Sequence, residues 1–383
     1  MKSSAFLYPW DVNGDPDAPA RIADLGVRQV TLASAYHSTR ALTPRHPRHR
    51  IVTAAHAAVL YPPGAHWQRR ELRPYAAGDW APGDAFGTAA AALADAGVEV
   101  HSWVVLAHNS RMGADHPETS VVNAYGDRYP WAPCIAQAAT RAYLVDLAAE
   151  AAARPGAHGT ELESCGWYGL AHLHAHDKIA GVPLGDAAQY LMSLCFCAAC
   201  AEGYAALGLA ADELPAAVRS ALEPVWRGAA LGDATIADLI GAELAAATLE
   251  FRTAAARSLQ EEVVAAVRAA APAGFQVLLH ADPVPHHCGA NAGVDPAHIL
   301  SVADGVVVPC TGGPELLAPF AAVSEGQVIA ANLTVVSGMG GSPGTLGRDA
   351  EAAARLGATE LRLYHAGLAG AEDLAAVRGA LKH

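Results

Sequence analysis

Long apolar runs are absent from this sequence, and so is any surplus of positive charge. No stretch of 18 or more apolar residues occurs, which excludes a transmembrane helix. Lys and Arg number 25 against 38 Asp and Glu, so the net charge of −13 makes nucleic acid and anionic membrane surfaces poor partners. The N-terminal apolar run at residues 5–11 is too short for a signal-peptide core, which predicts a cytoplasmic protein.

Motifs of several enzyme classes are also missing. No Gly-x-Gly-x-x-Gly turn follows the first predicted strand, and neither a Gly-x-Ser-x-Gly motif nor a phosphate-binding loop occurs. We therefore expect no organic cofactor and no serine nucleophile. Cysteines are few, with seven in 383 residues, which argues against a disulfide scaffold and agrees with reduced thiols or metal ligands.

β-rich runs recur eight times, separated by alanine-rich helical stretches. We expect strands at residues 5–12, 29–36, 98–106, 159–164, 275–280, 305–309, 327–333 and 360–365. The sequence predicts helices between them at residues 18–25, 86–96, 138–153, 296–303 and 348–356. This alternation predicts a single α/β domain over residues 1–383, folded as a (β/α)8 TIM barrel. A doubly wound open sheet is the alternative.

The connection between the fourth and fifth strands is much longer than an ordinary loop. Residues 165–270 include predicted helices at 184–206, 213–228 and 235–271, which we interpret as a helical extension on the barrel. This segment carries Cys195, Cys197 and Cys200 in a Cys-x-Cys-x-x-Cys motif. Helical residues two apart do not share a face, so the spacing favours a metal-bearing turn over buried thiols on a helix. A structural Zn²⁺ takes four ligands, and Cys134 and Cys165 are the candidates for the fourth.

The order of these motifs resembles that of family 42 β-galactosidases and related barrel glycosidases. The sequence Trp131-Ala132-Pro133-Cys134 is followed by Thr140-Arg141-Ala142-Tyr143, then by the strand Thr160-Glu161-Leu162-Glu163 and the cysteine motif. The resemblance implies a glycoside hydrolase in which Cys134 is the fourth zinc ligand and the fourth-strand glutamate is the general acid. The segments at 36–40 and 176–178 also resemble a set of actinobacterial barrel proteins, which implies the fold but no activity.

Two departures from the family pattern limit what the resemblance implies. Leu162 stands where the family has an Asn before the acid, and the seventh strand, Ile329-Ala330-Ala331-Asn332-Leu333-Thr334, has no glutamate nucleophile. A retaining mechanism with two glutamates in that layout is therefore not expected.

Polar residues gather at the predicted C-terminal ends of the strands, where barrels build their sites. Glu161 and Glu163 share one face of the fourth strand, and Glu163, nearer its end, is the predicted catalytic acid with Glu161 in support. Glycoside hydrolysis needs a second carboxylate, for which we prefer Asp282 over Asp11 because its strand neighbours the fourth. The structural alternative is an inward glutamate paired with Arg362. The expected substrate-binding residues are Asp11, Tyr36, His37, Arg40, His108, Asn109, Trp167, His176, Asp177, Lys178, His280 and His365.

Three functions stay open. The leading hypothesis is a glycoside hydrolase acting on a small carbohydrate, with a structural zinc. A metal-dependent barrel isomerase or hydrolase would use Glu161 or Glu163, Asp282 and several of the 18 histidines as ligands. A catalytically silent sugar-binding barrel is favoured by the missing acid of the seventh strand. The oligomeric state is not set by the sequence, and a homo-oligomer remains an alternative.

Overall fold

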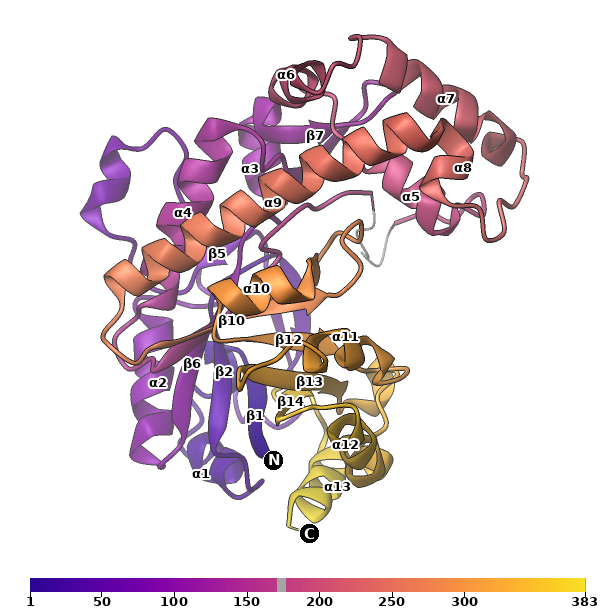
Figure 1. Cartoon of the computed structure of the whole chain (residues 1–383). Helices are drawn as coiled ribbons and strands as arrows, with labels where there is room; N and C mark the ends of the chain where they lie inside the picture. The colour runs from indigo at the N-terminus through magenta and orange to yellow at the C-terminus, as the bar shows by residue number, and fades with distance from the viewer. Residues whose placement is uncertain (171–176, 383) are drawn as a thin grey trace.

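The computed structural model, which describes residues 1–170 and 177–382, is built around a closed parallel barrel (Figure 1). Its strands run in the order β1 (Lys2–Leu7), β14 (Glu360–Tyr364), β13 (Val328–Thr334), β12 (Gly305–Pro309), β10 (Gln276–Asp282), β9 (Gly159–Glu163), β6 (Glu99–Val105) and β2 (Gln29–Tyr36). Parallel pairing of β2 with β1 closes the sheet. The predicted TIM barrel is therefore confirmed, and the open doubly wound sheet is excluded.

The first strand differs most from its expected bounds. It was expected over residues 5–12, but β1 covers Lys2–Leu7 and is followed by the 3-10 turn η1 (Pro9–Asp11). Pro9 has no backbone N–H to give to a strand pairing, so the strand ends before it and the turn begins there. Tyr8 thus lies at the end of the strand, and Asp11 lies in the turn beyond it.

Helices surround the barrel and follow its strands along the chain. They are α1 (Ala18–Ala23), α2 (Ala85–Asp95), α3 (Ser110–Asp115), α4 (Ala138–Ala152), α10 (Pro296–Val302), α11 (Ala318–Ala321), α12 (Leu346–Arg355) and α13 (Ala371–Leu381). The side chain of Asp295 accepts a hydrogen bond from the His298 amide (2.8 Å) and so caps α10, while Pro296 takes the first helical position. In the described ranges, no helix has both the length and the apolar character needed to cross a membrane.

The described residues between β9 and β10 form five helices: α5 (Gly185–Met192), α6 (Ala198–Ala206), α7 (Glu213–Trp226), α8 (Ile236–Ile240) and α9 (Ala242–Ala270). Figure 1 shows α5 to α8 gathered near one end of α9, which runs back along the barrel beside α4. The single helix expected at 184–206 is broken between α5 and α6. The one expected at 235–271 is broken at Gly241, whose φ of 84° lies in the left-handed region.

Short strands complete the chain. β3 (Thr39–Leu42) and β4 (Ile51–Ala54) form one antiparallel hairpin, and β7 (Ser120–Val122) and β8 (Arg128–Pro133) form another. β5 (Ala58–Val59) pairs antiparallel with the end of β2, and β11 (Ala292–Gly293) pairs with the end of β10. These strands follow β2, β6 and β10, and so they build on the C-terminal end of the barrel.

Candidate active site

The barrel interior contains a buried ion pair. Arg362 Nε lies 2.5 Å from Glu161 Oε1, and neither side chain reaches solvent. Thr31 Oγ1 also donates to Glu161 Oε1 (3.0 Å), and His280 Nε2 lies 3.6 Å from Oε2. Burial alone would raise the pKa of Glu161, but the Arg362 charge and His280 outweigh it and lower the pKa to about 2. Glu161 is therefore an ionised partner of Arg362. The alternative role expected for an inward glutamate, pairing with Arg362, is thus taken by Glu161 and not by Glu163.

Glu163 follows one strand period later, at the C-terminal end of β9. Its Oε2 accepts a hydrogen bond of 2.8 Å from Nε1 of Trp103 on the neighbouring strand β6. The Glu163 side chain is buried but not sealed, with 8% of the residue exposed. The two glutamates of β9 thus have different surroundings, because Glu161 meets a cation and Glu163 meets an indole.

Four aromatic residues surround Glu163, and we call them the aromatic collar: Tyr8, Tyr36, Trp103 and Tyr364. The Tyr8 and Tyr36 rings meet edge-on, with centroids 4.9 Å apart. Trp103 meets Tyr36 edge-on, with ring centroids 4.6 Å apart. Burial raises the pKa of the three phenols, that of Tyr364 to about 12, so they stay neutral hydrogen-bonding groups near neutral pH.

Two titratable groups lie beside the collar, where β1 and β14 end. His365 stacks on Tyr8 (4.2 Å between centroids), and burial lowers its pKa to about 3, which keeps the ring neutral. Asp11 Oδ2 accepts from the Tyr8 amide (2.7 Å). Burial raises the pKa of Asp11 to about 7, although the Tyr8 amide and the Arg45 charge oppose that rise. A carboxyl that titrates near neutral pH has the acidity that proton transfer requires.

Two histidines among the expected substrate-binding residues lie on the β2 and β6 side of the collar. The rings of His37 and His108 meet edge-on at 5.0 Å, and the His108 ring also stacks on Tyr168 at 4.5 Å. Burial lowers the pKa of His37, and the negative charge of Glu163 offsets part of that shift. His37 is therefore electrostatically coupled to Glu163.

Other expected site residues lie outside this group. Trp167 is buried against α9, where its indole donates to the Arg252 carbonyl (2.9 Å) and its ring lies 4.6 Å from the Arg252 guanidinium carbon. Asn109 caps α3 by accepting from the Met112 amide (3.0 Å). His280 is buried beside Glu161, which is farther from the C-terminal end of the barrel than Glu163. Arg40, Asp177 and Lys178 are exposed. His176 lies outside the described residues.

Asp282, the preferred second carboxylate, is held by its own loop. Its Oδ1 accepts from the Val284 amide (2.8 Å), and its Oδ2 is bonded to His287 Nδ1 (3.0 Å). Asp282 lines a cavity of about 240 Å³ together with Asp186, Gln189, Tyr190, His286, His287, Cys288, Ala290 and Asn291. His286 and His287 were not among the predicted site residues, although their position just after the fifth strand indicates a place at the C-terminal end of the barrel.

The aromatic collar was also missed in part. Tyr8 was not predicted, because the first strand was expected to continue to residue 12 and Tyr8 then lies in its middle. Trp103 was predicted only as one residue of an apolar strand. Trp103 lies two residues after His101 on β6. Residues two apart on a strand point to the same face, so a polar His101 on the inner face would have placed Trp103 there too.

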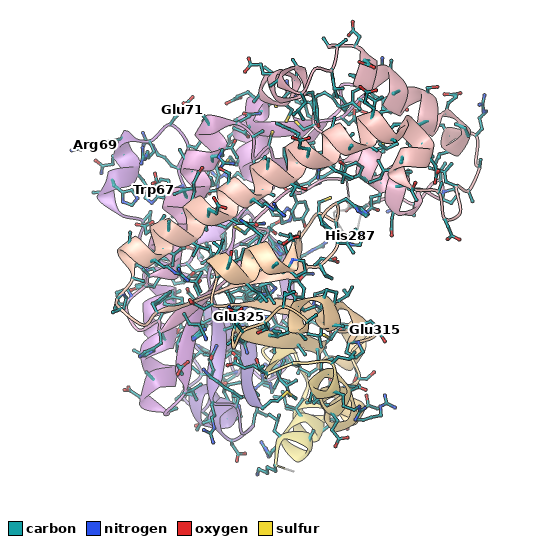
Figure 2. The ribbon with its side chains drawn as sticks, in the orientation of Figure 1. Trp67, Arg69, Glu71, His287, Glu315 and Glu325 are labelled. Atoms are coloured by element: carbon teal, nitrogen blue, oxygen red, sulfur yellow. The ribbon has the colours of Figure 1, made fainter. Side chains whose placement is uncertain are left out.

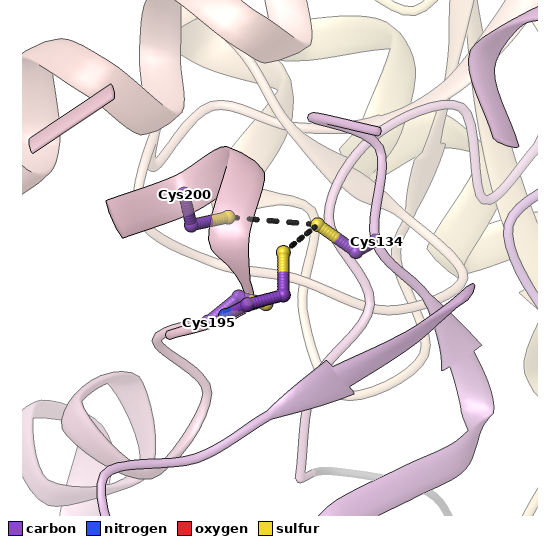
Figure 3. A group of neighbouring side chains, drawn as sticks. Cys134, Cys195 and Cys200 are labelled. Carbon is purple, nitrogen blue, oxygen red and sulfur yellow. Dashed lines mark hydrogen bonds between the residues drawn. The ribbon is translucent and has the colours of Figure 1, made fainter. Parts of the chain in front are cut away.

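The four predicted metal-binding cysteines come together, and Figure 3 labels Cys134, Cys195 and Cys200 of this group. Cys134 Sγ lies 3.6 Å from Cys197 Sγ and 3.5 Å from Cys200 Sγ, and all four sulfurs lie within 4.8 Å of one another. A tetrahedral zinc with Zn–S bonds near 2.3 Å separates its sulfurs by about 3.8 Å, so the group fits a metal ion such as zinc. Cys195 Sγ also accepts from the amides of Val122 and Cys197 (both 3.5 Å), which favours a thiolate.

The elements around this cluster explain the spacing of its motif. Cys134 directly follows β8, whereas Cys195 and Cys197 lie in the break before α6 and Cys200 lies in its first turn. Cys165, the other candidate for the fourth ligand, lies outside the group, and burial raises its pKa to about 12.

Comparisons with known proteins show the fold. No protein-family model matches the chain, and no curated protein matches it in sequence. Among solved structures, α-L-fucosidase isoenzyme 2 from Paenibacillus thiaminolyticus is similar over 100% of this chain and 49% of its own, with a TM-score of 0.60 and 10% identity. The catalytic domain of β-amylase from Paenibacillus polymyxa is similar over 99% and 97%, with a TM-score of 0.56 and 11% identity.

A GH42 β-galactosidase from G. stearothermophilus is similar over 100% of this chain and 56% of its own, with a TM-score of 0.56 and 12% identity. The chain spans about half the length of the fucosidase and of this galactosidase. The structural neighbours are thus glycoside hydrolase barrels, and at these identities the likeness concerns their fold.

Proposed function

We propose that this barrel is a glycoside hydrolase-like enzyme that acts on a small carbohydrate or glycoside, with Glu163 as the general acid. The observation that carries the proposal is the position of Glu163 at the end of β9, hydrogen-bonded by Trp103 and surrounded by phenol groups. A carboxyl at this end of a barrel strand is where such enzymes place their chemistry. Aromatic faces pack on the apolar faces of sugars, and phenol hydroxyls bond their hydroxyl groups.

Asp282 remains our proposed second carboxylate, and Asp11 is its competitor. Asp282 comes from the strand next to β9 but has both oxygens engaged, whereas Asp11 has an oxygen, Oδ1, with no partner among the described residues. Comparing Asp282→Asn with Asp11→Asn distinguishes the two, because substitution of the second catalytic carboxylate should lower the turnover rate far more than substitution of the other residue. The anomeric configuration of the product would then assign retention or inversion.

The four-cysteine cluster would serve the fold rather than the chemistry. We assign it a structural Zn²⁺, because four thiolates leave no coordination position for substrate. Residues 165–270 would then be a helical extension of one barrel domain, held to β8 by this ion.

The experiment that tests the function is turnover of a panel of aryl glycosides and oligosaccharides. Wild type should cleave at least one substrate, and Glu163→Gln should lose the activity while folding normally. Glu325→Gln is the matched control, because Glu325 is exposed and precedes β13 at the other end of the barrel (Figure 2). Brief EDTA treatment should leave activity intact unless the structural zinc is lost.

A binding-only barrel makes a different prediction in the same assay. β13 ends in Asn332, Leu333 and Thr334, without an acid, which is the observation that favours this second function. Sugar-dependent thermal stabilisation without turnover of any substrate would support it and would contradict the hydrolase proposal.

A further inference from the structure

The end of β10, the loop after it and the first turn of α5 place carboxylate and imidazole side chains around one cavity. Asp282 ends β10, His286 and His287 lie in the loop after it, and Asp186 comes from α5, about a hundred residues earlier in the chain. All four line the cavity of about 240 Å³ described above. Figure 2 shows His287 where this loop faces the helices inserted between β9 and β10.

The His287 ring is held in a definite orientation. Its Nδ1 lies 3.0 Å from Asp282 Oδ2, and only 14% of the Asp282 side chain is exposed. A histidine that binds a metal commonly gives its other ring N–H to a carboxylate, which fixes the tautomer and makes the free nitrogen a better ligand. The Asp282 bond therefore leaves His287 Nε2 as the atom available to a ligand.

A second ligand atom lies close to that nitrogen. His287 Nε2 is 4.0 Å from Asp186 Oδ2. Two ligand atoms that bind one ion tetrahedrally at about 2.1 Å lie ~3.4 Å apart, so binding would draw the Asp186 carboxylate closer to His287. The His286 ring lies beside that of His287, with centroids 4.9 Å apart and planes at 82°. Asp186 is largely exposed, so its carboxylate is free to adjust to an ion.

We propose that His287, Asp186 and His286 form a binding site for a divalent transition-metal cation, with Asp282 orienting His287. Nitrogen and carboxylate donors suit Zn²⁺, Co²⁺ and Mn²⁺. Three protein ligands leave coordination positions for water or a substrate oxygen, unlike the closed four-cysteine cluster. The site does not depend on the proposed hydrolase function, because binding can be measured without turnover.

The test is calorimetric titration of the full-length protein with Co²⁺, without removing any metal that the cysteine cluster holds after purification. Wild type should bind one Co²⁺ at this site. His287→Gln and Asp186→Asn should each weaken that binding by at least about tenfold, and Asp282→Asn should weaken it by ~10–100-fold, as loss of an orienting carboxylate does.

The matched control is His298→Gln. His298 Nε2 also pairs with a carboxylate, Glu261 Oε1 at 2.8 Å, but it belongs to α10. This variant should bind Co²⁺ as wild type does. Because Asp186 is 86% exposed, Asp186→Asn should fold normally even if changes at His287 disturb the loop. The proposal is overturned if wild type binds no Co²⁺, or if binding survives unchanged in both His287→Gln and Asp186→Asn.

Discussion

Trp103 and Glu163 are joined by a hydrogen bond of 2.8 Å from the indole Nε1 to Oε2, which links the neighbouring strands β6 and β9 at the C-terminal end of the barrel. The carboxylate thereby gains a rigid donor inside an aromatic environment. The bond satisfies the Glu163 oxygen at a small cost in side-chain entropy, because the fully buried Trp103 ring is already held in place by packing.

Trp103→Phe removes this donor while keeping an aromatic ring. We expect a loss of about 1–3 kcal/mol in the free energy of unfolding, because a buried acceptor is left without its partner, and reduced turnover of any substrate of the wild type. Urea denaturation measures the first effect. Trp10→Phe is the control, since the buried Trp10 Nε1 has no hydrogen-bond partner among the described residues. Equal losses in the two variants would contradict a role for the Trp103 hydrogen bond.

Arg362→Met leaves the Glu161 carboxylate buried without its cation. We expect this change to cost ~3–5 kcal/mol of unfolding free energy, and the double change with Glu161→Gln to cost less than the sum of the single changes. Chemical denaturation at neutral pH measures all three variants. Additive losses would mean that the two side chains do not act as a pair.

The same pair predicts a pH dependence. The pKa of Glu161 is lowered from 4.5 to about 2 in the fold, so its contribution to stability is present above pH 4.5 and is lost as the pH falls toward 2. Glu161→Gln should therefore be less stable than wild type at neutral pH, with a difference that narrows below pH 4.5. A difference that stayed constant across that range would exclude this linkage.

Asp11 predicts the opposite sign. Its pKa is raised from 3.8 to about 7, so the folded state is favoured while the group is protonated and loses that advantage as the pH rises toward 7. Asp11→Asn should exceed wild type in unfolding free energy by up to about 4 kcal/mol at pH 8 and match it near pH 3. Thermal unfolding across this range tests the prediction, with Asp17→Asn at an exposed site as the control. No pH-dependent gain would show that Asp11 is not held in its protonated form.

Cys134→Ser should abolish metal binding by the four-cysteine cluster. We expect the bound zinc, measured by elemental analysis, to fall from one per chain to none, together with a marked drop in Tm, because a structural zinc contributes directly to folding. Cys310→Ser makes the same substitution at a buried cysteine outside the cluster, whose Sγ donates to the Val308 carbonyl (3.3 Å). The assignment fails if Cys134→Ser retains zinc, or if both variants lose stability equally.

The elements of the barrel could be predicted because their signals are local. A strand buried on both faces is a short apolar run, and a surface helix has a polar side and a cap, so residues 305–309 and 296–303 could be recognised from their own neighbours. The spacing of Cys195 and Cys197 indicated a turn, because two residues two positions apart do not share a helix face, although a single helix was expected over residues 184–206. The end of β1 was misjudged because Tyr8, Trp10 and Val12 continue the apolar pattern past Pro9.

Sequence alone thus determined the eight strands and the place of Glu163 at the end of one of them, and it predicted that Cys134 or Cys165 would join the cysteine motif. Tertiary structure decided which groups meet: Arg362 pairs with Glu161, Trp103 donates to Glu163, Cys134 joins the cysteine cluster, and Trp167 packs against α9. These contacts join residues up to 201 positions apart. They depend on the register of barrel strands and on side-chain rotamers, which local periodicity does not encode.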